Sequence, residues 1–148
     1  MRGIFTALLW SLSFFTMQAQ SITAILHKLD NGQRSDTLIS FNSGNELAYM
    51  PITVIKGKSP GTVYTIVAGI HGYEYPPIIA VQELMNEIDA DRLQGTLIIL
   101  PVANTASFYK RSPFVNPIDG KNLNTVFPGS ASGSITEKIA HWITKEVI

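Results

Sequence analysis

The chain has 148 residues, of which 45% are hydrophobic and 15% are charged, and its 11 basic residues balance its 11 acidic ones. This composition is that of an ordinary globular protein, and the length allows one domain at most. A net charge near zero gives no reason to expect a nucleic acid or an anionic membrane as a partner.

Residues 1–19 have the features of a secretory signal peptide. Arg2 supplies a positive charge, an apolar run follows over 4–15, and the small residue Ala19 ends the segment. The alternative is a membrane anchor, but the run is shorter than the ~20 residues that a helix needs to span a bilayer. We therefore expect cleavage near Ala19, export to the periplasm or the extracellular space, and no stable membrane span afterwards.

The chain contains no cysteine, which restricts both its stability and its chemistry. An exported protein without cysteine has no disulfide bonds, so its stability must come from an apolar core or from a metal. The same absence excludes a thiolate metal ligand and a cysteine nucleophile. Any metal ion must therefore be bound by His, Asp or Glu side chains.

The segment 20–59 is expected to be a region rich in β-structure that precedes the main domain, 60–148. Residues 22–29 and 36–41 have weak strand character, and an Asp-Asn-Gly turn signal separates them. A clearer strand covers about 48–55 and stops at a loop rich in glycine and proline.

Two apolar runs and the segment between them predict a βαβ unit. TVYTIVAGI, over 62–70, is typical of a strand that is buried on both faces in a parallel sheet. The pair Pro76-Pro77 suits the first turn of a helix, and apolar residues at spacings of three and four continue to about Ala90. TLIILPV, over 96–102, is the second buried strand, so the pattern indicates an α/β fold.

Residues 103–133 carry no periodic pattern, which is typical of a functional loop in a compact domain. Ser134 and Glu137 then have the spacing of a capping box, and they predict a helix with one apolar face. The chain stops at or within this helix. We therefore expect a truncated or partial sequence and an incomplete α/β domain.

The segment GIHGYE, over 69–74, follows the first apolar run, at the place where α/β sheets carry ligand-binding loops. Its glycines allow a tight turn, so His71 and Glu74 can point at one centre. An imidazole nitrogen and a carboxylate oxygen suit zinc, although a catalytic zinc needs three protein ligands. The structural alternative is a histidine that caps the loop and a glutamate that is favoured at a helix N-terminus.

The loop PIDGKNLNTVFPG, over 117–129, is the second feature that suggests chemistry. Its Asp-Gly and Pro-Gly pairs are explained by turn formation alone. An asparagine in this loop, held by apolar neighbours, could also orient a polar substrate group, and Arg111 could bind a carboxylate or a developing oxyanion.

Four segments, in this order, resemble the succinylglutamate desuccinylase/aspartoacylase family of the zinc carboxypeptidase-like group. They are GIHGYE, the strand end PVAN, the loop DGKNLN-x-VFPG and the helix start S-x-TEKIA, and the resemblance covers residues 60–148. It implies an α/β fold with a mixed, largely parallel sheet and flanking helices. It also implies one zinc ion and hydrolysis of an amide or ester bond in a small acylated substrate.

The resemblance assigns roles to four residues of this chain. His71 and Glu74 match the first two zinc ligands, Asn124 matches a substrate-binding asparagine, and Arg111 matches an arginine that polarises the scissile carbonyl. The family's third ligand, a histidine, and its catalytic glutamate are expected beyond Ile148. Neither of the other two histidines of the chain matches a ligand position.

The chain departs from the family at Thr125, because the family has LNR-x-FPG where this chain has LNTVFPG. A threonine cannot clamp a substrate carboxylate as an arginine does. Either the substrate lacks that carboxylate, or another residue binds it, or activity is lost.

Other functions stay open on the sequence alone. One is a secreted carboxypeptidase-like peptidase that acts on peptides or cell-wall fragments. Another is an inactive binding module on the same fold, and a third is a purely structural α/β domain, which leaves the ordered motifs unexplained.

Overall fold

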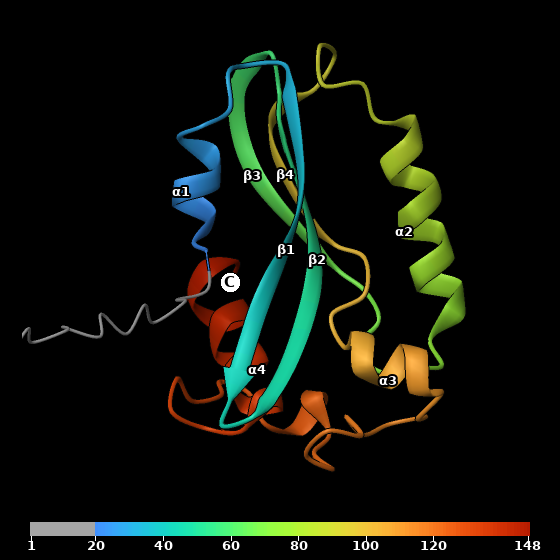
Figure 1. Cartoon of the computed structure of the whole chain (residues 1–148). Helices are drawn as coiled ribbons and strands as arrows, with labels where there is room; N and C mark the ends of the chain where they lie inside the picture. Colours follow the sequence, from blue (N-terminus) through green and yellow to red (C-terminus); the bar gives the residue numbers. More distant parts are fainter. Residues whose placement is uncertain (1–19) are drawn as a thin grey trace, which may run out of the picture.

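The computed structural model describes residues 20–148, so the expected signal peptide, 1–19, lies outside the described residues. Four strands form one sheet in the order β1-β2-β4-β3, with helices on both of its faces (Figure 1). The elements are α1 (Ile22–Leu26), β1 (Gln33–Ser43), β2 (Glu46–Lys56), β3 (Ser59–Val67), α2 (Tyr75–Glu87), β4 (Gln94–Leu100), α3 (Thr105–Lys110), the 3-10 helix η1 (Leu123–Thr125) and α4 (Ile135–Glu146).

The sheet is mixed, and its pairings confirm the α/β fold that was expected. β1 and β2 form an antiparallel hairpin, and β2 also pairs antiparallel with β4. β3 pairs parallel with β4, and α2 connects the two, as the predicted βαβ unit requires. Because β2 bonds directly to β4, the sheet is continuous between the N-terminal segment, 20–59, and the residues that follow it.

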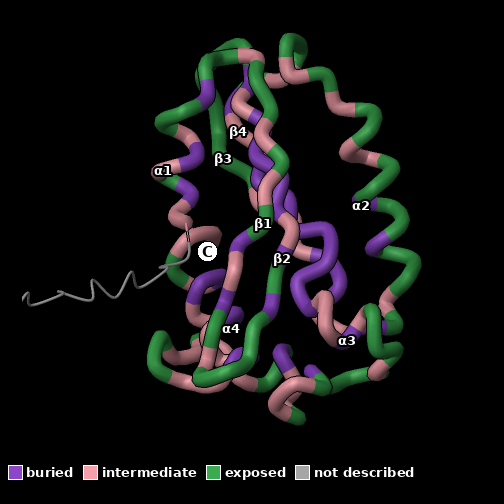
Figure 2. Tube along the Cα trace, viewed as in Figure 1, coloured by how far each residue is buried: buried purple, intermediate pink, exposed green. Residues whose placement is uncertain are grey.

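The apolar core lies on both faces of this sheet. On one face α1 and α4 pack against β1 and β2 in a large cluster that includes Met50 and Trp142. On the other face α2 packs over a smaller cluster that includes Val81 and Ile99. Figure 2 shows the buried positions concentrated along the middle of the sheet and on the inner side of α4. The helix expected after Pro76 and the helix expected after Ser134 are therefore both confirmed.

The strand expected over 22–29 is wrong, because Ile22–Leu26 forms the helix α1. Ser21 is its N-cap, and the hydroxyl of Ser21 accepts a hydrogen bond from the backbone N–H of Ala24 at 3.1 Å. Ile22 and Ile25, one helical turn apart, are both buried. The serine cap and this spacing of three were the signals in the sequence that indicated a helix.

The start of the described chain is bound to its last helix, α4. The indole N–H of Trp142 donates to the carbonyl oxygen of Gln20 at 3.2 Å. The backbone N–H of Ile22 donates to the carboxylate of Glu146 at 2.9 Å. The two hydrogen bonds join residues that are 122 and 124 positions apart in the sequence.

The strand expected over 62–70 exists as β3, but the prediction that it is buried on both faces is wrong. β3 is the last strand of the sheet, and its neighbouring residues Val63 and Tyr64 are 55% and 67% exposed. Successive side chains of a strand point to opposite faces, so both faces of β3 are open here. Apolar composition does not reveal this, because burial depends on which elements lie beside the strand.

The long segment 103–133 is mostly irregular, as expected, but it contains α3 and η1. α3 has six residues and η1 has three, so both are too short to produce a periodic pattern in the sequence. Among residues 20–148, none of the helices is both long enough and apolar enough to cross a bilayer.

Candidate active site

The turn that follows β3 is positioned by the end of β4. The backbone N–H of Ala103 donates to Ala68, and that of Asn104 donates to Gly69, both at 2.9 Å. Gly69 has a φ of 65°, a conformation that favours glycine, and a Cβ there would lie 3.0 Å from the Cα of Val102. The chain therefore leaves β3 in close contact with the β4 end and turns toward α2.

Gly72 brings this turn against α3. Its backbone N–H donates to the hydroxyl of Ser107 at 3.0 Å. A Cβ on Gly72 would lie only 2.4 Å from the backbone carbonyl oxygen of Ser107, so no larger residue fits without a backbone shift. Glycine is required here by this close approach of two backbone segments, and His71 is held next to it.

Asn104, the last residue of the PVAN segment, connects the two strand ends. It is buried, and its side-chain oxygen caps α3 by accepting from the backbone N–H of Ser107 at 3.2 Å. Its side-chain nitrogen donates to the carbonyl oxygen of Ile70 at 3.4 Å. One asparagine therefore fixes both the start of α3 and the residue before His71.

His71 and Glu74 converge, as the sequence predicts. The Nδ1 atom of His71 lies 2.8 Å from Oε1 of Glu74, and the backbone N–H of His71 donates to the other carboxylate oxygen at 3.2 Å. The His71 side chain is 18% exposed and that of Glu74 is 41% exposed, so a small ligand can reach both. Glu74 occupies the N-cap position of α2, where the helix dipole favours a negative charge.

Asn122, which was not among the residues expected at the site, contacts the other side of the His71 ring. Its Oδ1 lies 3.1 Å from Nε2 of His71 and also accepts from the backbone N–H of Asn124 at 2.9 Å. Asn122 is the N-cap of η1. An Asn that precedes a turn signalled this cap, but its partner across 51 residues could not be deduced from local spacing.

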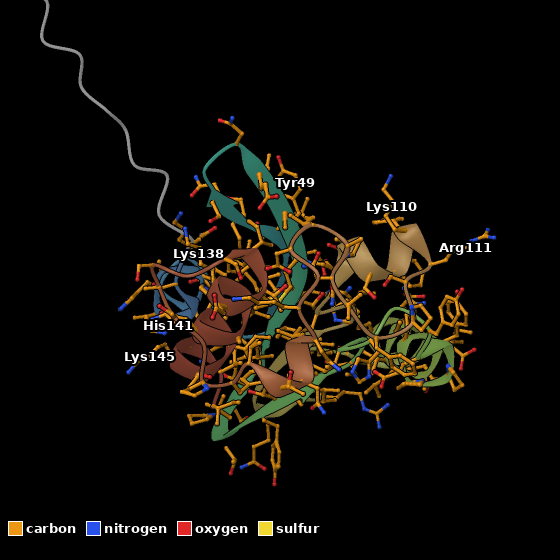
Figure 3. The ribbon with its side chains drawn as sticks, turned by 90° about the horizontal axis from the view of Figure 1, so that it is seen from below. Tyr49, Lys110, Arg111, Lys138, His141 and Lys145 are labelled. Atoms are coloured by element: carbon orange, nitrogen blue, oxygen red, sulfur yellow. The ribbon has the colours of Figure 1, made fainter. Side chains whose placement is uncertain are left out.

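The two remaining site residues are not placed against His71 and Glu74 by any contact of the described residues. Asn124 is exposed, two residues from the contact that Asn122 makes. Arg111 is the exposed C-cap of α3 in the left-handed conformation, with φ of 53°. Figure 3 shows Lys110 and Arg111 extending outward from the end of α3. Their substrate roles therefore stay predictions.

The loop that carries Asn122 is bound to the N-terminus of α4 by two pairs of residues. Thr136 donates its backbone N–H and its hydroxyl to the carboxylate of Asp119, at 2.8 Å and 2.6 Å. The ammonium of Lys121 lies 2.7 Å from the carboxylate of Glu137. We refer to Asp119, Lys121, Thr136 and Glu137 as the loop clamp.

The clamp carboxylates are held in their charged forms. Burial alone would raise the pKa of Asp119, but the hydrogen bonds from Thr136, Ser134 and Lys121 outweigh it and lower that pKa. The hydrogen bond from Lys121, followed by those from Ser134, lowers the pKa of Glu137 to about 2.

The donor pair fits zinc in type and in convergence. An imidazole nitrogen and a carboxylate oxygen point at the same small region, and both are preferred zinc donors. Within residues 20–148, however, no group of three His, Asp, Glu or Cys side chains is close enough to hold a metal. The described residues therefore offer one converging pair of donors and no complete set of three.

The chain is similar in sequence to a family of known enzymes. The model of the succinylglutamate desuccinylase/aspartoacylase catalytic domain matches residues 60–147. The N-alpha-acetyl-L-2,4-diaminobutyric acid deacetylase of Halomonas elongata is 41% identical over 100 residues, which are 67% of this chain and 28% of that enzyme.

Solved structures agree with the sequence matches. A succinylglutamate desuccinylase/aspartoacylase from Rhodobacter sphaeroides superposes with a TM-score of 0.70 at 26% identity, over 80% of this chain and 38% of that chain. The product-bound ectoine utilization protein EutE (DoeB) from Ruegeria pomeroyi also gives 0.70, at 30% identity, over 79% of this chain and 37% of that chain. The chain thus spans well under half the length of these relatives.

Proposed function

Because the chain belongs to the succinylglutamate desuccinylase/aspartoacylase family, we propose that it forms part of a zinc-dependent hydrolase that cleaves an acyl group from a small acylated substrate. The observation that carries this proposal is the convergence of His71 and Glu74 at 2.8 Å, at the end of a strand and the start of a helix. A relative that removes an acetyl group from a diamino acid makes an N-acylated amino acid the first substrate class to test.

Each predicted site residue of this chain would have a separate role. His71 and Glu74 would hold the zinc, which supplies Lewis-acid polarisation of the scissile carbonyl and a bound water of lowered pKa. Asn124, on the loop beside His71, would orient a polar group of the substrate, and Arg111 would stabilise the oxyanion if it reaches the carbonyl. A glutamate outside these residues would carry the proton from the water to the leaving group.

The two-ligand proposal is tested by zinc content and activity in the intact protein. We expect His71→Gln and Glu74→Gln each to remove stoichiometric zinc, measured by elemental analysis, together with hydrolysis of N-acyl amino acids. His141→Gln is the matched control, because His141 lies on α4, where the wild-type zinc content should be kept. Retention of zinc in both site variants would place the metal elsewhere.

The substrate class is tested by a panel of N-acyl amino acids and C-terminal peptides. Faster hydrolysis of the acyl amino acids supports the deacylase, whereas exclusive cleavage of the peptides would replace it with a peptidase. Export is a separate proposal, because it rests on residues 1–19 alone. Terminal sequencing of the protein recovered from its producing cells should find a chain that starts near Gln20.

A further inference from the structure

Phe114 is an exposed aromatic residue that contacts the candidate site. Its ring lies edge-on to the ring of His71, with centroids 5.6 Å apart and planes at 82°. Phe114 is 64% exposed, and the next residue, Val115, is 38% exposed. A small molecule that reaches both His71 and Glu74 would therefore lie next to an apolar surface that is open to solvent.

The other aromatic residues of this region are explained by their packing on one another. The rings of Tyr73 and Tyr75 stack with centroids 5.8 Å apart, and Tyr75 contacts Phe108 of α3 edge-on at 6.0 Å. In the part of the chain that the structure describes, the aromatic partner of Phe114 is His71 itself. A ring that stays this exposed buries little apolar area, so the stability of the core does not account for it.

The backbone is fixed on both sides of Phe114. Before it, the N–H of Ser112 donates to the carbonyl oxygen of Ser107 at 2.9 Å, and the hydroxyl of Ser107 donates to the carbonyl oxygen of Ser112 at 2.6 Å. The same hydroxyl accepts a hydrogen bond from the turn that carries the candidate site. After it, Asn116 is completely buried, and its backbone N–H donates to the carbonyl oxygen of Lys121 at 2.8 Å. The phenylalanine is therefore held at the centre of three residues between two anchors.

The cations of the neighbouring segments are directed elsewhere. The ammonium of Lys121 lies 2.7 Å from the carboxylate of Glu137. Lys110 and Arg111 extend outward from the end of α3 (Figure 3). A carboxylate placed against the ring of Phe114 would lose water without gaining a charged partner from these three residues, whereas an alkyl chain would bury apolar area.

We propose that Phe114 is a specificity-determining residue that binds the acyl group of the substrate, and that this group is apolar and uncharged. This inference rests on the hydrolase proposed above. An N-acyl amino acid carries a carboxylate on its amino-acid half, so the acyl half is the one that fits an apolar surface. The substrate class is therefore an amino acid with an alkanoyl group, rather than one whose acyl group ends in a carboxylate.

The test compares the N-acetyl, N-hexanoyl and N-succinyl derivatives of one amino acid as substrates of the intact, zinc-loaded protein. Complete burial of one methylene group favours binding about fourfold, and the hexanoyl chain has four more of them than the acetyl group. Because an open surface buries these groups only in part, we expect kcat/KM to be about tenfold higher for the hexanoyl substrate than for the acetyl one. The succinyl substrate should have the lowest kcat/KM, since its carboxylate would meet the apolar ring.

Two substitutions of Phe114 then show whether its ring causes this preference. In Phe114→Ala the ratio of kcat/KM for hexanoyl to that for acetyl should fall about tenfold, toward one, mainly through a higher KM for the hexanoyl substrate. Phe114→Leu keeps a large apolar side chain and should retain most of the preference. A merely structural role would lower kcat for both substrates by the same factor and leave the ratio unchanged. Tyr64→Ala, at a position of β3 that is 67% exposed, is the matched control and should keep the wild-type ratio.

The outcomes separate this inference from the function on which it rests. Hydrolysis with the same hexanoyl-to-acetyl ratio in Phe114→Ala and in the wild type overturns the role of Phe114 and leaves the hydrolase intact. A wild-type protein with its highest kcat/KM for the succinyl substrate also overturns it. A zinc-loaded protein that hydrolyses none of the three substrates overturns the hydrolase function itself.

Discussion

Thr136 donates both its backbone N–H and its hydroxyl to the carboxylate of Asp119, at 2.8 Å and 2.6 Å. The contact joins the first turn of α4 to the loop that carries Asn122, so the helix and the candidate site are mechanically connected. Thr136 is completely buried, and a buried hydrogen bond to a charged group contributes more to stability than an exposed one.

Thr136→Val tests this contact, because valine keeps the shape of the side chain and removes only the hydroxyl. We expect a decrease of about 1.5–3 kcal/mol in the free energy of unfolding, measured by chemical denaturation. The control is Thr144→Val, since that hydroxyl donates only to the carbonyl oxygen of Ala140 within α4. An equal loss of unfolding free energy in the two variants would show that the hydrogen bond from the Thr136 hydroxyl to Asp119 does not stabilise the fold.

The low pKa of Glu137 predicts a specific acid sensitivity. Its pKa is about 2 in the folded protein and 4.5 ordinarily, so the clamp stabilises the fold fully above about pH 4.5 and loses this contribution as the pH falls toward 2. Glu137→Gln removes the titrating group, so the variant should be less stable than the wild type at pH 7, with the difference shrinking between pH 4.5 and 2. Chemical denaturation of both proteins at several pH values across this range measures the difference.

Glu83→Gln, at an exposed position of α2, serves as the reference for Glu137→Gln. This reference should follow the wild-type dependence of stability on pH. If the loss of unfolding free energy in Glu137→Gln, relative to the wild type, stays constant down to pH 2, the role of the Lys121–Glu137 pair is contradicted.

Gly72→Ala tests the close approach of the His71 turn to α3. The added Cβ would lie 2.4 Å from the carbonyl oxygen of Ser107, so the turn must move. We expect a loss of about 1–3 kcal/mol in stability together with weaker zinc binding. Gly44→Ala is the comparison, because a Cβ there meets nothing within 4 Å and only the φ of 61° opposes the substitution. We expect this strain to cost about 1 kcal/mol of stability and zinc binding to stay unchanged.

Thr125→Arg tests the departure from the family pattern in the NLNTVFPG segment. Thr125 is exposed, and its hydroxyl donates to the backbone carbonyl oxygen of Asn122 at 3.1 Å. An arginine can form two parallel hydrogen bonds with a carboxylate, so we expect a lower KM, by about tenfold, for acyl amino acids with a free carboxylate. The control is the same acyl amino acid with its free carboxylate converted to an amide. An equal change in KM for the acid and the amide would show that the introduced arginine does not recognise the carboxylate.

The regular elements that carry the site could be predicted from the sequence, because each depends on local patterns. Pro76 and the spacing of apolar residues indicate α2, the Ser134–Glu137 spacing indicates α4, and the glycines around His71 indicate a turn. The approach of Glu74 to His71 needs only three residues of chain. For this reason the contact between His71 and Glu74 was predictable from the sequence, while its wider surroundings were not.

The features that the sequence did not reveal depend on distant partners. Asn122 reaches His71 across 51 residues, and nothing in the NLN segment distinguishes its first asparagine from its second. The exposure of Val63 and Tyr64 depends on the place of β3 at the end of the sheet. α1 was mistaken for a strand because five residues are too few for a helical period to outweigh their β-branched side chains.

The hydrogen bonds from Trp142 to Gln20 and from Ile22 to Glu146 have a consequence for the order of folding. α1 is synthesised first among these elements, yet α4, which holds its start by these two hydrogen bonds, is synthesised last of them. A chain that has emerged only as far as the sheet can pack α1 on β1 and β2 but cannot complete its contacts, because those with α4 require closure of a loop over 124 residues. Amide exchange in α1 should therefore report on the integrity of α4.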